Sequence, residues 1–478
     1  MTNFLLITSD EHRWDAMGCA GHPQIRTPNL DKLAARGTRF TNAYTASPMC
    51  VPARAALATG RAICQTGHWD SATPYAGTPE SWMHRLQAAG HETVSIGKLH
   101  FRSTADDNGF STEIMPMHVM GGIGWTIGLL RKNLPEYKAA SELAADVGEG
   151  PSSYTDYDRN ITDAAVNWIE TSQHKKGKGW AAFISLVSPH YPLICPAEFS
   201  QLYRPEDMAL PIGYSDEPPS HPELARTAAF FNYDDYFDEA GMRAAKCAYF
   251  GLTSFLDNCV GKILDALVRS GQAEDTVVCY ISDHGEMLGD HGLWTKQVMH
   301  EGSVGVPMIL AGPNIPAGNL CNTPVMLTDI APTALAVMQQ PPDGYSGTSL
   351  VHLASQPDQP DRTAFSEYHD GGSATGSFMI RWQGWKYIYY VGARPQLFNL
   401  QDDPDELEDL ASSAPDAPAV IKALAEGAAR LRAICSPEEV NARAFSDQAR
   451  KIAALGGEEA CLANYNFNHT PVPDTPST

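Results

Sequence analysis

Short apolar runs that end abruptly in ionisable residues constrain the fold of this chain more than any other feature. Runs of strand length occupy residues 3–8, 93–97, 181–187, 276–281 and 308–311. Helical patterns lie between them, for example over 27–36, 161–170 and 244–270. Strands that alternate with helices predict an α/β fold, with a large and mainly parallel sheet that is sandwiched by helices.

The pattern changes in the last quarter of the chain. Residues 378–382 and 385–391 alternate around Gln383-Gly384, which predicts a β-hairpin, and 415–435 is alanine-rich and helical. We therefore expect a catalytic domain over 1–360 and a smaller C-terminal α+β subdomain with an antiparallel sheet over 361–478. The last residues, from about Asn464, are rich in Pro, Asn and Thr and are expected to lack regular structure.

The composition argues against some partners. The 478 residues carry 34 Lys and Arg against 56 Asp and Glu, a net charge of −22, which disfavours binding to nucleic acid or an anionic membrane. No stretch reaches the length of a membrane span, and the apolar run in MTNFLLITSDEHRW is too short for a signal peptide. The ten cysteines include no CxxC pair, which argues against a zinc ribbon or a thioredoxin-like motif. With no export signal, we expect a cytoplasmic protein with reduced thiols.

Four of the predicted strands end in ionisable residues. These are Asp10 and Glu11, Lys98 and His100, His190, and Asp283 and His284. Ligands of open α/β sheets bind beyond the carboxyl ends of the strands. Any one of these residues could be a helix cap or a loop charge, but four such endings on one edge of a sheet predict a functional site.

Asp10, Glu11, Asp283 and His284 are the candidate metal ligands. Two carboxylates at one strand end repel each other unless a cation neutralises them. Carboxylates favour Ca²⁺, Mg²⁺ or Mn²⁺, and an imidazole shifts the preference toward Mn²⁺ or Zn²⁺. The alternative is a pair of solvated surface carboxylates, which the apolar character of the preceding strand disfavours.

A matching cationic set consists of Lys98, His100, His190 and Lys296. Together these side chains would hold a tetrahedral oxyanion and the leaving oxygen of a substrate. Lys296 lies in the stretch GDHGLWTK, shortly after Asp283, where a plain surface lysine is the alternative.

Cys50 is predicted to lie at the N-terminus of a helix over 53–59. Pro48 and Pro52 flank it, and Arg54 follows one helical turn later on the same face. The helix dipole and this arginine would favour a thiolate. However, a thiolate suits an oxygen-rich metal site poorly, and no cysteine-protease arrangement accompanies it.

The stretch Cys50-Val51-Pro52-Ala53-Arg54, continuing to Gly60-Arg61, resembles the signature of the type I sulfatases of the alkaline phosphatase superfamily. Further landmarks resemble the family in order and spacing, at residues 10–11, 97–100, 188–190, 282–285, 396–400 and 403–406. The histidine of Asp283-His284 is similar to that of the choline sulfatase and phosphonate monoester hydrolase branch.

The resemblance implies an alkaline phosphatase-like fold and a modified nucleophile. Cys50 would be converted to formylglycine, an aldehyde, by a formylglycine-generating or equivalent enzyme that reads Pro52 and Arg54. One metal ion, Ca²⁺ or Mn²⁺, would be held by residue 50 together with Asp10, Glu11, Asp283 and His284. A homodimer or homotetramer is also expected.

The resemblance further implies a role for each cationic residue. The hydrated aldehyde would attack sulfur, while Lys98 and Arg54 stabilise the diol and the sulfuryl oxygens. His190 and Lys296 would assist the leaving oxygen. His100 would take the proton whose removal allows sulfate to depart.

Three features depart from the family pattern. Many members carry Asp-Asp or Asp-Gln where this chain has Asp10-Glu11, and Asp-Asn where it has Asp283-His284. An arginine often found between Glu301-Gly302 and Val306-Pro307 is absent. The histidine of Asp283-His284 leaves the metal open between Ca²⁺ and Mn²⁺.

The leading functional hypothesis is hydrolysis of a small organic sulfate ester. A phosphonate monoester or phosphodiester hydrolase with the same machinery is the alternative, and a non-catalytic anion-binding relative is a third possibility. Trp69, Asp70 and Tyr75 are candidate substrate-binding residues, since an acidic residue beside aromatic rings could favour a cationic group such as choline. A loop packed on its own helix is the other interpretation of that stretch.

Several further residues are weaker candidates. Trp125 lies in a glycine-interrupted segment that could form a lid over the site. Supporting or loop roles suit the remaining histidines near the motifs, which are His12, His68, His291 and His300.

Overall fold

The computed structural model describes residues 2–171, 178–215, 217–464 and 469–473. An eight-stranded sheet runs in the order β11-β2-β10-β9-β1-β7-β4-β5. Its strands are β1 (Asn3–Asp10), β2 (Gly37–Phe40), β4 (Glu92–Lys98), β5 (Thr112–Met117), β7 (Trp180–Pro189), β9 (Thr276–Ser282), β10 (Met308–Ala311) and β11 (Asn319–Cys321). Neighbouring strands are parallel, except that β10 is antiparallel to both β9 and β2.

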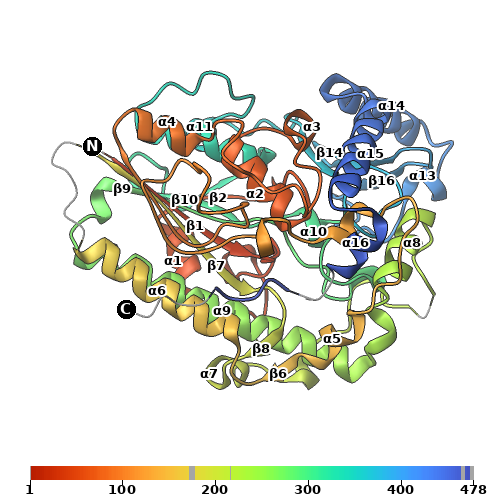
Figure 1. The fold of residues 1–478 in the computed structure, drawn as a ribbon, viewed down its shortest axis with the longest axis horizontal. Helices are drawn as coiled ribbons and strands as arrows, with labels where there is room; N and C mark the ends of the chain where they lie inside the picture. The colour runs from red at the N-terminus through yellow and green to blue at the C-terminus, as the bar shows by residue number, and fades with distance from the viewer. Residues whose placement is uncertain (1, 172–177, 216, 465–468, 474–478) are drawn as a thin grey trace.

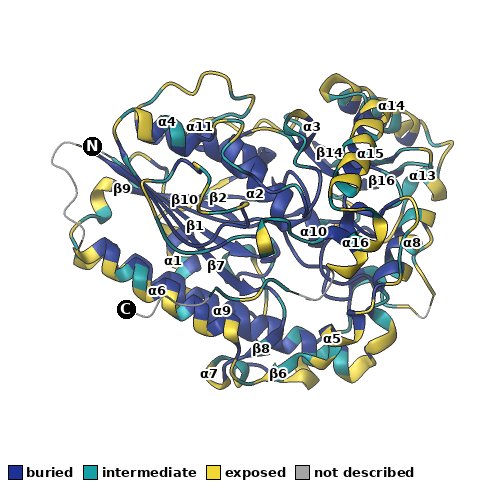
Figure 2. Ribbon diagram, in the orientation of Figure 1, coloured by how far each residue is buried: buried dark blue, intermediate teal, exposed yellow. Residues whose placement is uncertain are grey.

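Helices cover both faces of this sheet (Figure 1). Phe4 and Leu6 of β1 pack in one cluster with α2 (Cys50–Thr59), α4 (Trp82–Ala88) and α11 (Ile330–Val337). Leu5 and Ile7 pack on the opposite face with α1 (Pro28–Ala35), α6 (Ser153–Thr171) and α9 (Glu239–Arg269). Because side chains alternate along a strand, a run that is apolar at every position is buried on both faces. Figure 2 shows these central strands as buried.

A four-stranded antiparallel sheet follows near the C-terminal end. It consists of β13 (Ala364–Tyr368), β14 (Ser377–Trp382), β15 (Trp385–Tyr390) and β16 (Gln396–Asn399). Trp382 pairs with Trp385 across a tight turn, which confirms the predicted hairpin. The helices α14 (Pro418–Ile434), α15 (Pro437–Ala454) and α16 (Glu458–Ala463) lie beside this sheet in Figure 1.

Shorter elements connect these parts. Two minor sheets pair β3 (Ala43–Tyr44) with β12 (Val325–Met326), and β6 (Val147–Glu149) with β8 (Leu193–Cys195). The other α-helices of the described residues are α3 (Ile63–Thr66), α5 (Ala140–Ala145), α7 (Ala197–Ser200), α8 (Pro222–Phe231), α10 (Glu301–Val304), α12 (Leu350–Ala354) and α13 (Leu410–Ser413).

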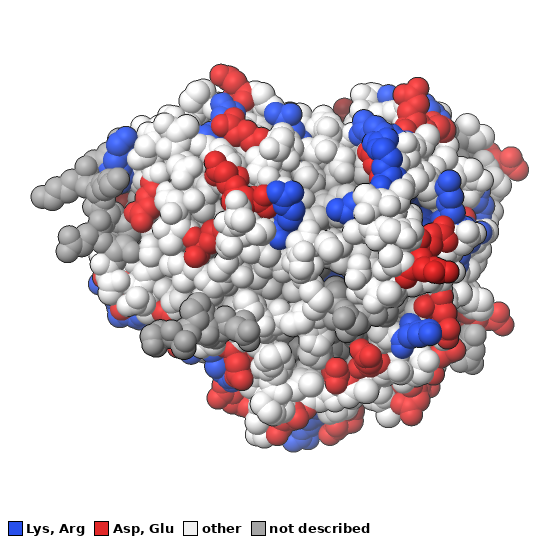
Figure 3. Space-filling model, in the orientation of Figure 1, with Lys and Arg blue, Asp and Glu red and all other residues white. Residues whose placement is uncertain are grey.

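All five strands predicted from apolar runs are present, and the mainly parallel sheet between helices is confirmed. The antiparallel direction of β10 was not predicted, and neither were the short strands β2 and β11 beside it. Among the described helices, none combines the length and apolar character needed to cross a bilayer. On the face drawn in Figure 3, Lys and Arg side chains are interspersed with Asp and Glu.

Candidate active site

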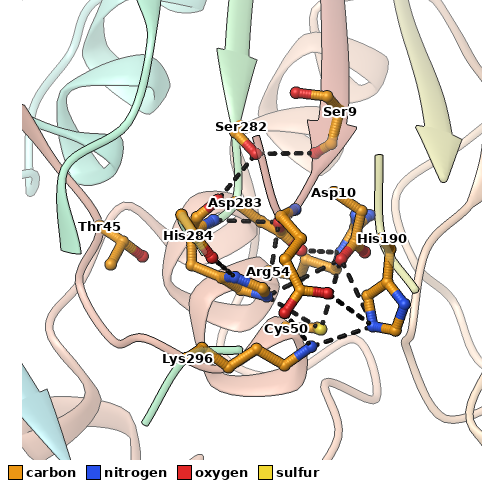
Figure 4. Close-up of polar contacts among 12 residues, drawn as sticks. Ser9, Asp10, Thr45, Cys50, Arg54, His190, Ser282, Asp283, His284 and Lys296 are labelled. Carbon is orange, nitrogen blue, oxygen red and sulfur yellow. Dashed lines mark hydrogen bonds and ion pairs between the residues drawn. The ribbon is translucent and has the colours of Figure 1, made fainter. Parts of the chain in front are cut away.

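The ends of three adjacent parallel strands bring the predicted site residues together. Ser9 of β1 pairs with Ser282 of β9, so that Asp10 and Asp283 leave neighbouring strands side by side. On the other side of β1, Asp10 pairs with Pro189 of β7, and His190 follows directly. Figure 4 shows the resulting cluster, with the N-terminus of α2 delivering Cys50 to it.

Asp10, Cys50, Asp283 and His284 form a group suited to a metal ion. All four are buried, and each offers a ligand atom such that these atoms lie within 4.8 Å of one another. Cys50 Sγ lies 3.1 Å from Nε2 of His284 and 3.6 Å from Oδ1 of Asp10. His284 Nδ1 lies 2.9 Å from the carbonyl oxygen of Gly285, which leaves Nε2 facing the group. Two buried carboxylates and an imidazole nitrogen are donors that fit Ca²⁺ or Mn²⁺.

Glu11 is not part of this four-residue group. It forms a second cluster with Asp10 and His190, and its Oε1 lies 3.0 Å from Nζ of Lys296. Its backbone N–H donates to Oδ1 of Asp283 over 3.3 Å. Glu11 therefore lies beside the candidate metal group, and its role as a ligand stays a prediction.

Arg54 bridges the two aspartates beneath the candidate metal group. Its Nε donates to Asp283 over 2.8 Å, and a terminal nitrogen donates to Asp10 over 2.9 Å. The other terminal nitrogen donates to the carbonyl of Lys98 and the hydroxyl of Ser185. With its guanidinium committed to these partners, Arg54 is placed to hold the carboxylates, whereas contact with the sulfuryl oxygens was expected.

Asp10 is the centre of the site's electrostatics. Its Oδ2 lies 2.7 Å from Nζ of Lys98, and both side chains are fully buried. Burial alone would raise the pKa of Asp10, but the nearby Lys98, His190 and Arg54 hold it well below its ordinary value. The carboxylate is therefore ionised, as a metal ligand requires.

The pKa of the Cys50 thiol is shifted in the opposite direction from that of Asp10. Burial, reinforced by the negative charge of Asp10, raises the pKa of Cys50 far above its ordinary value. The thiolate that a helix N-terminus would favour is therefore not stabilised by these surroundings. This environment suits an uncharged residue at position 50.

A cavity opens directly onto Cys50, and the cationic set lines it. Lys98, His100, His190 and Lys296 all contribute to its wall. Nζ of Lys296 lies 3.0 Å from Nε2 of His190, so these two groups act together. Both ring nitrogens of His100 are buried without a hydrogen-bond partner among the described residues, which leaves them available to a bound substrate.

Burial also sets the protonation state of both histidines. It lowers the pKa of His100 and of His190 well below the ordinary value, and the positive charges of Lys98 and Lys296 lower it further. Each ring is therefore neutral near pH 7 and can accept a proton.

Trp69, Asp70 and Tyr75 do not line the cavity, contrary to the sequence-based expectation. All three are buried in contacts within the protein. Trp69 Nε1 donates to Asp447, Asp70 accepts from Gln448, and the hydroxyl of Tyr75 donates to the carbonyl of Pro79. The loop is therefore joined to α15 and to its own continuation, and neither interpretation of the sequence included the contacts with α15.

The walls of the cavity come largely from other segments. Trp125 lines it, in agreement with its expected place over the site. Sequence reasoning missed several aromatic and polar residues of the wall, because no motif marks them: Tyr137, Tyr154, Tyr191, Phe231, Tyr233, His469 and Thr470. His12, His68, His291 and His300 lie outside the wall.

Comparison with known proteins identifies the family. The model of the family described as "Sulfatase" matches residues 2–340, which is well over half of the chain. The chain belongs to the sulfatase family. A second model, described as "N-sulphoglucosamine sulphohydrolase, C-terminal", matches residues 289–433. The geometry around Cys50 is therefore that of a sulfatase-family hydrolase.

Curated relatives of this sulfatase-family chain span most of its length. A choline-sulfatase of Rhizobium meliloti (strain 1021) is 30% identical over 439 residues, covering 86% of this chain and 82% of the relative. Arylsulfatase K of Danio rerio is 29% identical, covering 87% and 81%.

Solved structures share the alkaline phosphatase-like fold. The phosphonate monoester hydrolase of Agrobacterium radiobacter superposes with a TM-score of 0.72 at 23% identity, covering 91% of this chain and 96% of that one. The corresponding enzyme of Silicibacter pomeroyi gives 0.74 at 21% identity, with the same coverage.

Proposed function

We propose that this chain hydrolyses a small organic sulfate ester, using a formylglycine derived from Cys50 and one divalent metal ion, Ca²⁺ or Mn²⁺. The observation that carries the proposal is the position of Cys50, which lies within the Asp10, Asp283 and His284 group and also lines the cavity. A side chain in that position touches both the candidate metal group and the substrate space.

Asp10, Asp283, His284 and residue 50 would hold the metal ion. Once bound, such an ion supplies positive charge that lowers the pKa of a hydroxyl and polarises a sulfuryl oxygen. The pairing of Arg54 with both aspartates keeps their carboxylates oriented toward the group.

Residues of the cavity wall would assist the attack on sulfur and the departure of the alcohol. The hydrated aldehyde at position 50 would attack sulfur through one hydroxyl oxygen as the S–O bond to the alcohol breaks, and the proton lost by that hydroxyl would balance the one given to the leaving oxygen. Lys98 and Lys296 neutralise the sulfuryl oxygens, and the His190–Lys296 pair delivers a proton to the leaving oxygen.

His100 completes the turnover. The ring nitrogen that carries no proton would accept the proton of the second hydroxyl, and the C–O bond to sulfate would break as the C=O bond of the aldehyde forms. Sulfate leaves with the bonding electrons. The resting aldehyde is restored without a separate hydrolysis of an ester.

The residues of the cavity wall suit two kinds of organic group in the substrate. It is rich in aromatic rings, and none of its described residues is Asp or Glu. Aromatic faces bind another aromatic ring or a quaternary ammonium ion. The relatives carry the names choline-sulfatase and arylsulfatase K, so choline sulfate and 4-nitrophenyl sulfate are the first esters to test.

A phosphonate monoester or phosphodiester hydrolase is the second candidate function, because a tetrahedral phosphonate would meet the same cationic residues. The test measures kcat/KM for 4-nitrophenyl sulfate and for 4-nitrophenyl phenylphosphonate in the metal-loaded protein. The proposal expects the sulfate to be preferred. A clear preference for the phosphonate would overturn it in favour of the second candidate.

The proposal includes two kinds of protein partner. A formylglycine-generating or equivalent enzyme would modify Cys50 before the chain folds, since Cys50 is 5% exposed in the folded protein. A homodimer or homotetramer is proposed as the working assembly.

A further inference from the structure

A short C-terminal segment reaches the active-site cavity. His469 and Thr470 line the same cavity as Cys50, Lys98 and His190. In Figure 1 this segment is the dark blue trace near α6. It lies beyond the residues that either family model matches, which end at 340 and 433.

Contacts with α6 and the core fix the segment in place. The hydroxyl of Tyr154, in α6, donates to the carbonyl of Thr470 over 2.8 Å. The rings of Tyr154 and His469 meet edge to face, with centroids 5.0 Å apart. Val472 packs against the hydrophobic cluster that includes Leu5 and Ile7 of β1.

Tyr154 connects this segment to the reacting groups. Its ring centroid lies 5.9 Å from that of His190, and Nε2 of His190 in turn contacts Nζ of Lys296. Tyr154 is 2% exposed and also lines the cavity. Tyr154 is thus in ring contact with both His190 and His469, and all three side chains line the cavity.

His469 itself offers an unused polar atom. Its Nδ1 is buried and has no hydrogen-bond partner among the described residues. A buried ring nitrogen without a partner is unfavourable, and a bound molecule with a polar group would relieve that cost. Across the cavity, Trp125, Phe231 and Tyr233 supply apolar surface.

We propose that the segment His469–Pro473 is a specificity-determining wall of the active site, and that His469 restricts the cavity to compact esters. This inference rests on the proposed sulfatase function. The wall limits the size of the alcohol on the side of α6, and the imidazole contacts that alcohol directly. The sulfate end of the substrate is recognised separately by Lys98 and Lys296.

The test compares two aryl sulfates of different size in the full-length, metal-loaded protein. The compact probe is 4-nitrophenyl sulfate, and the bulky probe is estrone sulfate. For His469→Ala, the ratio of kcat/KM for the bulky over the compact ester is expected to rise by about 10-fold or more, mainly through KM. A chain that ends at Asn464 is expected to show the same direction of change.

Leu462→Ala provides a matched control, because Leu462 is 43% exposed in α16 and does not line the cavity. In this control variant, the ratio of kcat/KM for the bulky over the compact ester should equal that of the wild type. A ratio unchanged within 2-fold in His469→Ala would overturn the inference, and so would an equal loss of activity on both esters, which indicates a structural role alone.

Failure of the proposed function is distinguishable from failure of the inference. If the wild type hydrolyses neither sulfate but does hydrolyse phosphonate monoesters, the sulfatase proposal fails. The size ratio is then measured with 4-nitrophenyl and estrone phenylphosphonates. The inference predicts the same rise in that ratio for His469→Ala, and an unchanged ratio would overturn the inference.

Discussion

The sulfur of Cys50 lies 3.1 Å from Nε2 of His284, although 234 residues separate them in the chain. Cys50 begins helix α2, and His284 follows the end of strand β9. The two meet because α2 packs on the sheet through Ala55 and Leu57, in the same cluster as Phe4 and Leu6 of β1. Packing of the core thus places a modifiable side chain against a candidate metal ligand.

Arg54→Met is expected to destabilise the protein strongly. It removes the guanidinium that pairs with both Asp10 and Asp283, which leaves Asp10 with Lys98 alone and Asp283 without a cationic partner. Losing one partner of a buried ion pair costs about 3–5 kcal/mol. Urea unfolding of the metal-free protein measures this loss. Arg61→Ala, at an exposed position of the same motif, should change the free energy of unfolding little, and equal effects of the two variants would contradict the assigned role.

His190→Ala and Lys296→Ala should impair the departure of the alcohol. Because the two side chains lie 3.0 Å apart at the cavity wall, each variant loses the same proton-delivering pair. For His190→Ala, the expected loss in kcat/KM is about 10²–10⁴-fold for phenyl sulfate, and much smaller for 4-nitrophenyl sulfate, whose alcohol leaves without help. Lys296→Ala should slow both esters, because it also removes a charge that neutralises the sulfuryl oxygens. Lys422→Ala, exposed on α14, is the control. An equal loss on both esters in His190→Ala would show that the pair does not serve the leaving oxygen.

Asp158 makes the stability of the folded protein depend on pH. Its carboxylate oxygens accept the N–H groups of Val187 and Ser188, just before His190, and burial raises the pKa of Asp158 from 3.8 to about 6. The folded protein therefore holds this proton more tightly than the unfolded chain does. The resulting stability is complete below pH 3.8 and is lost as the pH rises through about 6.

The comparison with Asp158→Asn tests this assignment, because the amide does not titrate. The wild type's free energy of unfolding, relative to that of the variant, should fall by about 2 kcal/mol between pH 4 and pH 7. Chemical unfolding across that range measures the difference. Parallel pH profiles for the two proteins would rule out the raised pKa.

Removing the metal should lower both activity and thermal stability. Without a cation, the carboxylates of Asp10 and Asp283 are balanced only by Arg54 and Lys98, and a ligand that binds the folded state alone stabilises it. Dialysis against EDTA, followed by addition of Ca²⁺ or Mn²⁺, shows which ion restores activity and the melting temperature. Asp283→Ala should be inactive and insensitive to EDTA. A wild type that keeps full activity in EDTA would contradict the metal assignment.

The strand ends were predictable from the sequence, and so was the core of the site. A run that is apolar at every position, such as Phe4–Ile7, forms a buried strand because both faces are covered. Parallel strands then bring their carboxyl ends to one edge, which places Asp10 beside Asp283. The partners of Arg54 required the structure, since one guanidinium on α2 could reach several carboxylates.

The organic side of the cavity was not predictable in the same way. Proximity to the motif in sequence suggested Trp69 and Asp70, yet both are used to join the loop to α15, through Asp447 and Gln448. His469 belongs to a stretch without helical or strand periodicity, so no pattern indicated where it would pack. Walls built by loops depend on tertiary contacts that local sequence does not specify.

The central claim is that an aldehyde at position 50 performs the reaction. The most direct test is mass spectrometry of the peptide containing Cys50, made on samples modified to different extents and assayed for sulfate release. The account predicts the aldehyde in every active sample, with activity proportional to the modified fraction. Full activity in a sample whose residue 50 is entirely the unmodified thiol would contradict it.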